Sequence, residues 1–575
     1  MRCPIFSPIT TVVVLATLSA PTLAHDNQYP LGVLDNAVGE KTSGHRFKCN
    51  LPRPLDPRDD GLVSSRDLFS GIDALETMVQ RHQSLVRIPS VCYDDLGGFD
   101  KDERWKPFED IPAVLKETYP LVHKHATVET INTFGLLYTV QGSEENLRPI
   151  LLTAHQDVVP VEPETLDQWK YPPFSAFYNE TEGFLYGRGA SDDKSAITAL
   201  MSAMEALLSQ DEYQPRRSVI FAFGFDEECS GYRGAGNISK TLEERYGKGK
   251  IAAILDEGGA GLQSLGDTLY ALPAVYEKGY LDVWLDLDVV GGHSSTPPPN
   301  TAIGIMSEII TTLERNPFEP KIEWNSPVHQ ALVCLARYSP SALPELTEAI
   351  HHGNLKIAAR ILAQLSRDSQ YFIQTSQAVD WIAGGQKINA LPEFVSVGVN
   401  HRYAPQDNIG GIEDRIVHLV EDIVRSYDLH LEAFEGDEDY KTYLAAKGIS
   451  PHAESAGHSW KPVYNGTLVL EARKKSYITP QSPTSGPIWD IFSGTVRHTF
   501  AHQASTVVVA PGAMTGNTDT RHYLNLSDNI YRWSPGSLKS FSNIHTINER
   551  LLMSEHLDMT RLYYDLIRNF DLADF

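Results

Sequence analysis

Acidic residues and one histidine follow three short apolar stretches of the chain, where they could act together. The polar groups come directly after these stretches, as His155-Gln156-Asp157, Asp226-Glu227-Glu228 and Asp256-Glu257. A fourth acid, Asp192, follows a glycine-containing turn. Carboxylates and imidazoles are ligands of divalent metals, and carboxylates a few ångströms apart repel one another unless a cation neutralises them. The pattern therefore predicts a metal centre that contains His155 and Asp192.

Two metal ions that share a bridging carboxylate would account for this number of acids. Such a pair would also lower the pKa of a bound water to about 7, which makes hydrolysis the natural chemistry. For any single position the alternative stays open that the acid caps a helix or lies in a surface turn. Four acidic positions at matching places in the chain favour the metal centre.

The sequence around these groups predicts an α/β fold that would position them. The stretches 150–154, 218–225 and 251–255 are typical of buried strands, and apolar residues recur at helical spacing after Asp192. Strands that alternate with helices predict a mostly parallel sheet with helices on both faces. In such sheets, functional groups gather at the carboxyl ends of the strands.

The character of the sequence changes near Gly279. Apolar and polar residues alternate over 281–289, which is typical of an antiparallel strand with one wetter face, and further helices and alternating strands follow up to about residue 440. We expect an inserted ferredoxin-like αβ domain, acting as a lid or dimerisation domain, at 280–440. The catalytic domain would then comprise 66–279 and 441–575.

The N-terminal region has the features of a secreted protein. Residues 1–24 combine an early arginine, an apolar run and a small-residue cleavage site, which predicts a signal peptide with no stable membrane span. Residues 25–65 are expected to form an extended leader. Four Asn-x-Ser/Thr sequons agree with passage through the secretory pathway to the outside of the cell, with the lumen of a vacuole as the alternative.

Charge and cysteine content narrow the possibilities further. A net charge of −25 argues against an electrostatically driven nucleic-acid binder. After removal of the signal peptide, Cys49, Cys92, Cys229 and Cys334 remain, an even number that permits two disulfides whose pairing the sequence leaves open. Cys229 directly follows Glu228, where it is either buried, disulfide-bonded or a metal contact.

The motifs together resemble those of the di-zinc peptidase family that includes aminoacylase and carboxypeptidase G, and in particular its carboxypeptidase S (Gly-X carboxypeptidase) branch. The resemblance covers about residues 75–570. It rests on His155-Gln-Asp157, Gly187-Arg-Gly-Ala-Ser-Asp192-Asp-Lys194, Glu227-Glu228, Asp256-Glu-Gly-Gly, Gly291-Gly-His293, Thr518-Asp-Thr-Arg521-His-Tyr523 and Ile544-His545-Thr-Ile-Asn-Glu549.

The resemblance implies a role for each residue of the centre. Asp192 would bridge two zinc ions; the other four ligands would be His155 and Asp256 on one ion, and Glu228 and His545 on the other. The neighbour of Asp256, Glu257, is the alternative for the fifth ligand. Glu227 would be the general base, and Asp157 would hold the His155 imidazole in its orientation.

Further residues are assigned to substrate and transition state. In relatives, a histidine equivalent to His293 stabilises the developing oxyanion, often from a partner subunit, so a homodimer is expected. A guanidinium suits the α-carboxylate of a carboxypeptidase substrate because of its bidentate geometry. Arg402 is the best candidate, with Asn389 and Arg521 as further candidates.

The resemblance implies a zinc metallopeptidase that cleaves the C-terminal amide bond of short Gly-X peptides. An N-acyl amino acid hydrolase or synthase of the aminoacylase type is the first alternative, because the same groups could act on either substrate. The second, from another class, is an inactive metal- or peptide-binding protein. Retention of Glu227, Asp157 and all the expected ligands argues against it.

Overall fold

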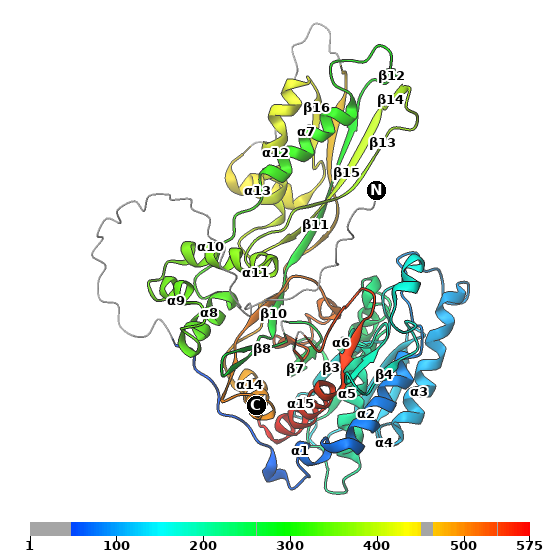
Figure 1. Cartoon of the computed structure of the whole chain (residues 1–575), viewed down its shortest axis with the longest axis vertical. Helices are drawn as coiled ribbons and strands as arrows, with labels where there is room; N and C mark the ends of the chain where they lie inside the picture. The colour runs from blue at the N-terminus through cyan, green and yellow to red at the C-terminus, as the bar shows by residue number, and fades with distance from the viewer. Residues whose placement is uncertain (1–47, 260, 450–463, 538) are drawn as a thin grey trace.

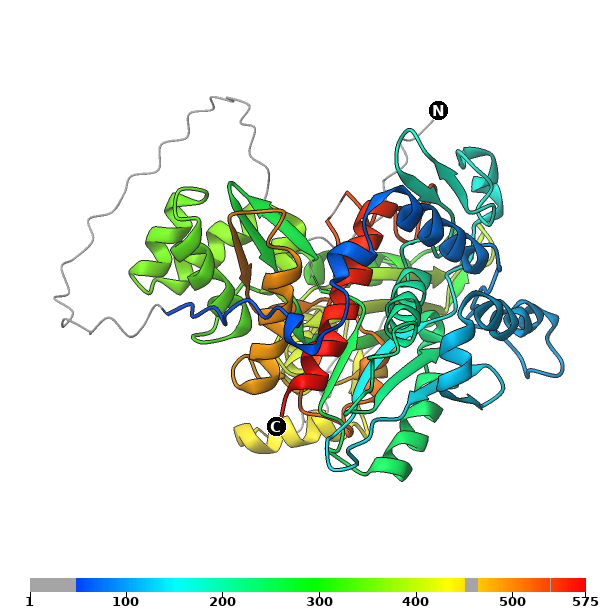
Figure 2. The same cartoon turned by 90° about the horizontal axis from the view of Figure 1, so that it is seen from below.

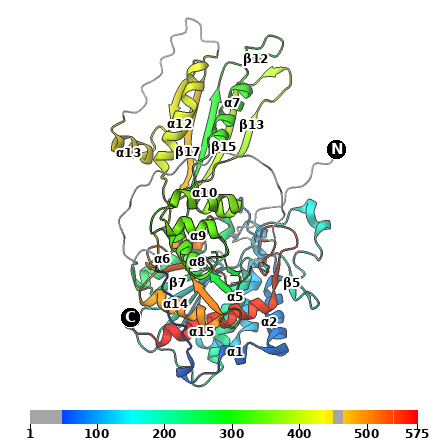
Figure 3. The same ribbon diagram turned by 60° about the vertical axis from the view of Figure 1, so that its left-hand side comes forward.

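The computed structural model describes residues 48–259, 261–449, 464–537 and 539–575, which form a larger α/β domain and a smaller domain extending from it (Figures 1 and 3). The expected signal peptide (1–24) and the first part of the leader lie outside the described residues. The described part of the leader lies against the larger domain. There the backbone amide of Leu55 donates to the carbonyl of Gly494 over 2.9 Å.

An eight-stranded sheet forms the centre of the larger domain. Its inner strands β6, β3, β7 and β20 are parallel neighbours. The pairs β1–β2, β2–β6 and β10–β20 are antiparallel, and the edge pair β10–β19 is again parallel. The strand order is β1 (Thr127–Ile131), β2 (Gly135–Val140), β6 (Val219–Gly224), β3 (Ile150–His155), β7 (Ala253–Asp256), β20 (Ile530–Arg532), β10 (Ala274–Glu277) and β19 (Gly512–Met514). The predicted α/β fold class is therefore confirmed.

Helices cover both faces of this sheet because its strands are apolar on both sides. Alternate residues such as Leu151 and Leu152 pack into separate cores on opposite faces. One core contains α5 (Lys194–Leu208), α2 (Gly71–Val86), α14 (Pro487–Thr499) and α15 (Met553–Leu572), and the other α6 (Ala235–Tyr246). Seen from below, α15 lies beside the N-terminal helices, which joins the two ends of the described chain (Figure 2).

The smaller domain, here called the lid, is a five-stranded sheet with two helices, α7 (Ala302–Arg315) and α12 (Ile409–Ser426), packed on it (Figure 1). Its strand order is β13 (Ala378–Gly384), β15 (Phe394–Tyr403), β11 (Gly279–Asp288), β17 (Thr467–Ser476) and β16 (His430–Ala433). Residues Leu281, Val283 and Leu285 alternate toward the helices and form a separate apolar core. The expected alternation in this region is thus present.

The lid boundaries differ from those expected from the sequence. Strand β17 lies beyond residue 440, yet it pairs with β11 inside the lid sheet. Conversely, the segment with α8 (Pro327–Tyr338), α9 (Pro344–His351), α10 (Leu355–Leu365) and α11 (Arg367–Phe372) packs into the core of the larger domain. Its apolar helix faces, such as that of Leu332 and Leu335, determine where it docks, and sequence order does not show this.

Short elements complete the larger domain and the lid. They are η1 (Arg58–Asp60), α1 (Ser65–Leu68), η2 (Glu103–Asp110), α3 (Ile111–Thr118), α4 (Pro120–His125), η3 (Pro163–Gln168), β4 (Phe177–Asn179), β5 (Phe184–Tyr186), η4 (Glu227–Cys229), β8 (Leu262–Leu265), β9 (Thr268–Ala271), β12 (Gly292–His293), β14 (Ala390–Leu391), α13 (Glu438–Lys447), β18 (Thr506–Val509), η5 (Asp519–His522) and β21 (Arg550–Leu552). No helix in the described part of the chain combines the length and apolar character that a bilayer span requires.

Candidate metal centre

The central strands deliver polar groups to one edge of the large sheet. His155 is the last residue of β3, and its neighbours β6 and β7 run parallel to it. The chain that leaves β6 therefore places Glu227 and Glu228, and the chain that leaves β7 places Glu257, beside His155. The predicted gathering of groups from three strands at this edge is present.

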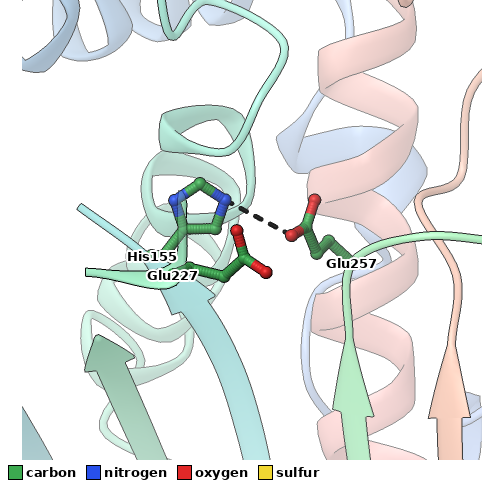
Figure 4. A group of neighbouring side chains, drawn as sticks. All are labelled: His155, Glu227 and Glu257. Carbon is green, nitrogen blue, oxygen red and sulfur yellow. Dashed lines mark ion pairs between the residues drawn. The ribbon is translucent and has the colours of Figure 1, made fainter. Parts of the chain in front are cut away.

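His155 is buried and its ring lies between carboxylates. Its Nδ1 atom is 3.1 Å from the carbonyl oxygen of Asp157 and 3.3 Å from Oδ1 of the same residue. Its Nε2 atom lies 3.1 Å from Oδ1 of Asp192 and 3.3 Å from Oε1 of Glu257. Figure 4 shows Glu257 directed toward this side of the ring, with Glu227 close by. One ring nitrogen thus meets the two acids that could share a cation, and the other is held by Asp157.

Asp192 lies between two histidines that are far apart in sequence. Its Oδ1 atom faces His155, whereas its Oδ2 atom is 3.0 Å from Nε2 of His545. The same His545 nitrogen is 3.1 Å from Oε1 of Glu228. The two oxygens of the Asp192 carboxylate therefore face two different histidines.

Pairing of β21 with β5 explains how His545 reaches this place. The segment before β21 lies beside the Gly187–Asp192 turn, where the amide of Gly187 donates to the carbonyl of Glu549 over 2.9 Å. His545 adopts a φ of 61°, a left-handed conformation that side chains other than glycine rarely take. Such local geometry is found at functional sites, where the surrounding structure holds it in place.

Asp157 connects the histidine to the Glu227-Glu228 turn. Its Oδ1 atom accepts from the backbone amide of Glu227 over 3.1 Å, and its Oδ2 atom accepts from that of Glu228 over 3.0 Å. The carboxylate is fully buried and also touches His155. One side chain thus orients a ring at the end of β3 and the turn after β6.

The structure selects Glu257 over Asp256 for the position beside His155. Adjacent residues at a strand end point in opposite directions, so only one of the two can face the centre. Glu257 contacts Nε2 of His155 and belongs to a potential metal-binding group with His155 and Glu227. Asp256 is buried beside Thr153 on the neighbouring strand. Of the two residues named from the sequence, Glu257 is therefore the one beside His155, whereas the preferred Asp256 faces Thr153.

The buried carboxylates of this site have shifted pKa values, which suits the binding of a cation. Burial first, and then the negative charge of Asp192, raise the pKa of Glu257 to about 8. Burial is also the main reason that the pKa of Glu227 lies well above its usual range. Burial opposes ionisation of Asp192, but contacts with His155 and His545 outweigh it and hold the pKa of Asp192 well below its usual value. A bound cation would stabilise all of these carboxylates in their charged form.

Glu549 supports the centre from outside, and the sequence did not reveal this role. Its Oε1 atom accepts from the backbone amides of Ser191 and Asp192, at 2.9 and 3.2 Å. Its Oε2 atom forms a buried ion pair of 2.7 Å with Arg188. Both residues occur in the motifs of the resemblance, but only the fold shows that they meet and hold the backbone at Asp192.

Two disulfides are present, Cys49–Cys334 and Cys92–Cys229. The second joins the residue after Glu228 to the segment before η2. Cys229 is therefore disulfide-bonded, one of the alternatives open at the sequence level, and does not act as a metal contact. Because Cys229 closes the η4 turn, the bridge restrains the backbone that carries Glu227 and Glu228.

The expected substrate-binding residues fall into two groups. Arg402 lies near the C-terminal end of β15 in the lid. Its Nη1 donates to Oδ1 of Asn517 over 3.0 Å, and its guanidinium lies over the ring of Tyr280. Burial, together with the positive charge of Arg521, lowers the pKa of Arg402. Asn517 lines the cavity that also contains Asp192 and Glu227, so Arg402 borders the candidate site.

His293 and Asn389 form the second group, away from the metal centre of the same chain. They lie at paired strands β12 and β14, at the end of the lid opposite the larger domain (Figure 1). His293 is exposed, and its Nδ1 atom accepts from the amide of Ser295 over 3.1 Å. Within one chain, the structure does not bring them to the centre.

Comparison with known proteins agrees with this geometry. The model of the peptidase family M20/M25/M40 matches residues 151–569. An uncharacterised carboxypeptidase of Schizosaccharomyces pombe is 39% identical over 90% of this chain and 84% of its own length. Carboxypeptidase S of Saccharomyces cerevisiae is 35% identical over 91% of this chain and 89% of its own.

The fold is also that of solved relatives. The crystal structure of human carnosine dipeptidase 1 superimposes with a TM-score of 0.57 at 12% identity, covering 91% of this chain and 100% of the other. A likeness at this identity concerns the fold alone. The family match and the carboxypeptidase relatives together show a metallopeptidase enzyme. The chain therefore belongs to the peptidase family M20/M25/M40, and within it to the carboxypeptidase S branch.

Proposed function

We propose that this enzyme is a di-zinc carboxypeptidase that hydrolyses the C-terminal amide bond of short peptides of the Gly-X type. The position of Asp192 carries the proposal. Its two oxygens face two different histidines at 3.1 and 3.0 Å, and each histidine has a further glutamate beside it. Two ligand sets that share one carboxylate fit two metal ions better than one.

The residues present fit a pair of zinc ions. His155 and Glu257 would hold one ion, Glu228 and His545 the other, and Asp192 both. Nitrogen and carboxylate oxygen donors are typical of catalytic zinc, which keeps a position open for water or substrate. When bound, the ions supply Lewis-acid activation of water and of the scissile carbonyl. Burial and the charge of Asp192 raise the pKa of Glu257, and a bound cation would offset both effects.

Glu227 is the proposed general base. It lines the cavity with Asp192 and lies within the group formed by His155 and Glu257, but it is not needed to complete either ligand set. A carboxylate beside the ligands can take a proton on its own oxygen from water and pass it to the leaving nitrogen. Asp157 assists by fixing the backbone of Glu227 and the ring of His155.

Arg402 is the proposed partner of the substrate α-carboxylate, with Arg521 close enough to add a second positive charge. Arg402 contacts Asn517, which lines the cavity. A C-terminal residue bound there would place its amide toward the metal centre. This arrangement requires a free α-carboxylate, which is what distinguishes a carboxypeptidase from an endopeptidase.

His293 and Asn389 would act on the centre of a second subunit. Their exposure on the far end of the lid supports a homodimer in which each lid reaches the partner's site. Mixing Glu227→Gln with His293→Ala chains tests this directly. In a mixed dimer one site regains an intact base and a partner histidine, so activity should return to about a quarter of the wild-type value for random pairing. No recovery would contradict the shared site.

The proposed activity is tested with purified protein and blocked glycyl-leucine. We expect close to two equivalents of zinc, release of free leucine, and loss of both zinc and activity on dialysis against a chelator. Glu227→Gln should lower kcat by about 10²–10⁴-fold while zinc content stays unchanged. Hydrolysis without metal, or full turnover by Glu227→Gln, would contradict the mechanism. A protein that binds zinc but hydrolyses no substrate would instead support the inactive binding protein.

An N-acyl amino acid hydrolase or synthase is the second candidate. The same centre can act on any amide next to a carboxylate-bearing residue, and apolar side chains of Phe372, Phe541 and Ile544 line part of its cavity. Turnover of a blocked dipeptide and of an N-acyl amino acid, measured side by side, separates the two activities.

We further propose that the protein acts in the secretory pathway, outside the cell or in a vacuole lumen. The two disulfides support an oxidising compartment. The predicted signal peptide (1–24) and the four sequons point the same way. Localisation of the tagged full-length chain, with glycosidase treatment, tests the proposal, and a cytosolic, unglycosylated protein would contradict it.

A further inference from the structure

A buried lysine lies at the point where the lid leaves the larger domain. Lys278 is the single residue between β10 of the large sheet and β11 of the lid sheet, and its side chain is fully buried. Figure 1 shows α11 beside this junction. Burial of an amine is costly unless its N–H groups find acceptors, so the hydrogen-bond partners of Lys278 must compensate for its burial.

The side chain of Lys278 holds the end of α11. Its Nζ atom donates to the carbonyl oxygens of Tyr371 and Gln374, at 3.0 and 2.8 Å. These two residues flank Phe372, the last residue of α11, which lines the cavity at the metal centre. The last carbonyls of a helix lack partners within the helix, and a lysine can supply them. The backbone on both sides of Phe372 is therefore anchored to the lid junction.

The backbone of Lys278 holds two further parts of the cavity wall. Its amide donates to the carbonyl of Met514 over 3.0 Å, and its carbonyl accepts from Nδ2 of Asn517 over 3.2 Å. Met514 and Asn517 line the same cavity as Phe372. Three parts of the wall, from the end of α11, the end of β19 and the loop after it, thus meet at one residue.

Asn517 extends this connection to the proposed partner of the substrate α-carboxylate. Its Oδ1 atom accepts from Nη1 of Arg402 over 3.0 Å, while its Nδ2 atom donates to Lys278. The two ends of one side-chain amide therefore join Arg402, on strand β15 of the lid, to the residue at which the lid begins. The Phe372 wall and the Arg402 guanidinium share this anchor.

The anchor does not depend on the charge of the lysine. Burial, and then the positive charge of Arg402, lower the pKa of Lys278 to about 7, while the negative charge of Asp407 opposes them. A neutral amine still carries two N–H groups, as many as Nζ uses for Tyr371 and Gln374. The wall can therefore be held in the same way on both sides of neutral pH.

We propose that Lys278 is a positioning residue that fixes the Phe372 wall of the cavity and thereby sets the KM for substrate. The proposal rests on the hydrolytic function proposed above. Lys278 is not among the described residues that line the cavity, so it acts through Phe372. A wall that contacts the substrate stabilises the ground state and the transition state alike. A looser wall should therefore raise KM and leave kcat unchanged.

Lys278→Met tests the anchor because it keeps a long side chain and removes the N–H groups. With blocked glycyl-leucine as substrate, we expect KM to rise by about tenfold, while kcat and zinc content stay unchanged. Phe372→Ala should raise KM as well. If Lys278 acts through Phe372, adding Lys278→Met to Phe372→Ala should raise KM no further.

Lys475→Met is the matched control. Lys475 belongs to lid strand β17, and its Nζ donates to Asp437 and Asp439, neither of which is among the described residues that line the cavity. This variant also loses a lysine and its hydrogen bonds, but it should keep the wild-type KM.

Amide hydrogen exchange gives a readout that does not depend on activity. Exchange in a peptide that covers residues 367–375 should be faster in Lys278→Met than in the wild type or in Lys475→Met, because the end of α11 loses its anchor. A thermal unfolding scan shows whether each variant is folded. If Lys278→Met does not fold, Lys278→Gln takes its place, since its side chain is shorter but keeps a polar end.

The outcomes separate this proposal from the proposed function. An unchanged KM in Lys278→Met, or a kcat and zinc content that fall with it, would overturn the positioning role. So would a further rise of KM when Lys278→Met is added to Phe372→Ala, or unchanged exchange in residues 367–375. If the wild-type protein cleaves no peptide, the hydrolytic function itself fails, and amide exchange alone then decides whether Lys278 holds the wall.

Discussion

Oδ2 of Asp157 accepts a hydrogen bond from the backbone amide of Glu228 at 3.0 Å, although 71 positions separate the two residues. The other oxygen of Asp157 accepts from Glu227 and touches the ring of His155. One carboxylate therefore orients a proposed ligand of each metal ion and the proposed base. Its role extends beyond the orientation of His155 that the sequence suggested.

Replacement of Asp157 tests this role. In Asp157→Asn, one oxygen becomes an NH₂ group and can no longer accept from both amides. We expect zinc affinity to fall by about 10–100-fold, with a matching loss of activity at limiting zinc that added zinc restores in part. Titration with a zinc-sensitive dye measures the affinity. Asp167→Asn, an exposed aspartate, is the control, and equal affinity in both variants would contradict the prediction.

The choice between Asp256 and Glu257 leads to a second prediction. Glu257→Gln should lose one of two zinc ions, because it removes a charged donor beside His155, whereas Asp256→Asn should retain both. Asp192→Asn should lose both ions. Metal content by mass spectrometry of the native protein distinguishes one from two ions per chain. Loss of an ion in Asp256→Asn alone would restore the assignment expected from the sequence.

The Cys92–Cys229 bridge should affect the centre more than Cys49–Cys334 does. The paired variant Cys92→Ser with Cys229→Ser releases the turn that carries Glu227 and Glu228, so zinc affinity and activity should fall together. Removal of either bridge should lower the free energy of unfolding by about 2–5 kcal/mol. Cys49→Ser with Cys334→Ser is the matched control and should keep full zinc affinity. Equal zinc loss in both pairs would show that global stability is responsible.

A buried glutamate in the lid predicts a dependence of stability on pH. Burial raises the pKa of Glu413 to about 8, and neither of its oxygens has a hydrogen-bond partner among the described residues. The folded state thus holds a proton that the unfolded chain releases near its ordinary value of 4.5. Stability should therefore be lost as pH rises from about 4.5 through 8, and stay low above it.

Glu413→Gln removes this titration. Its Tm should exceed that of the wild type at pH 9 and match it near pH 4, since the neutral amide avoids a buried charge. Differential scanning calorimetry across this range gives the comparison. Glu432→Gln, a partly exposed glutamate of the same domain, serves as control. Parallel pH curves for the wild type and Glu413→Gln would contradict the assignment.

Several features of the protein were determined by the sequence alone, because they depend on neighbours along the chain. The apolar runs before His155, Glu227 and Asp256 identify buried strands, and a parallel sheet places the ends of such strands at one edge. The motifs of the resemblance correctly indicated the family and the metallopeptidase class. The alternation in 281–289 likewise identified a strand of the lid.

Contacts between distant segments were decided only by the tertiary structure. Pairing of β21 with β5 brings His545 to Asp192, and pairing of β17 with β11 moves the lid boundary past residue 440. Glu257 faces His155 because the chain leaves β7 with that side outward, a one-residue difference that composition cannot show. Disulfide pairing and the docking of α8–α11 likewise depend on contacts between distant segments. Each depends on which surfaces meet in space, and local sequence carries no record of that.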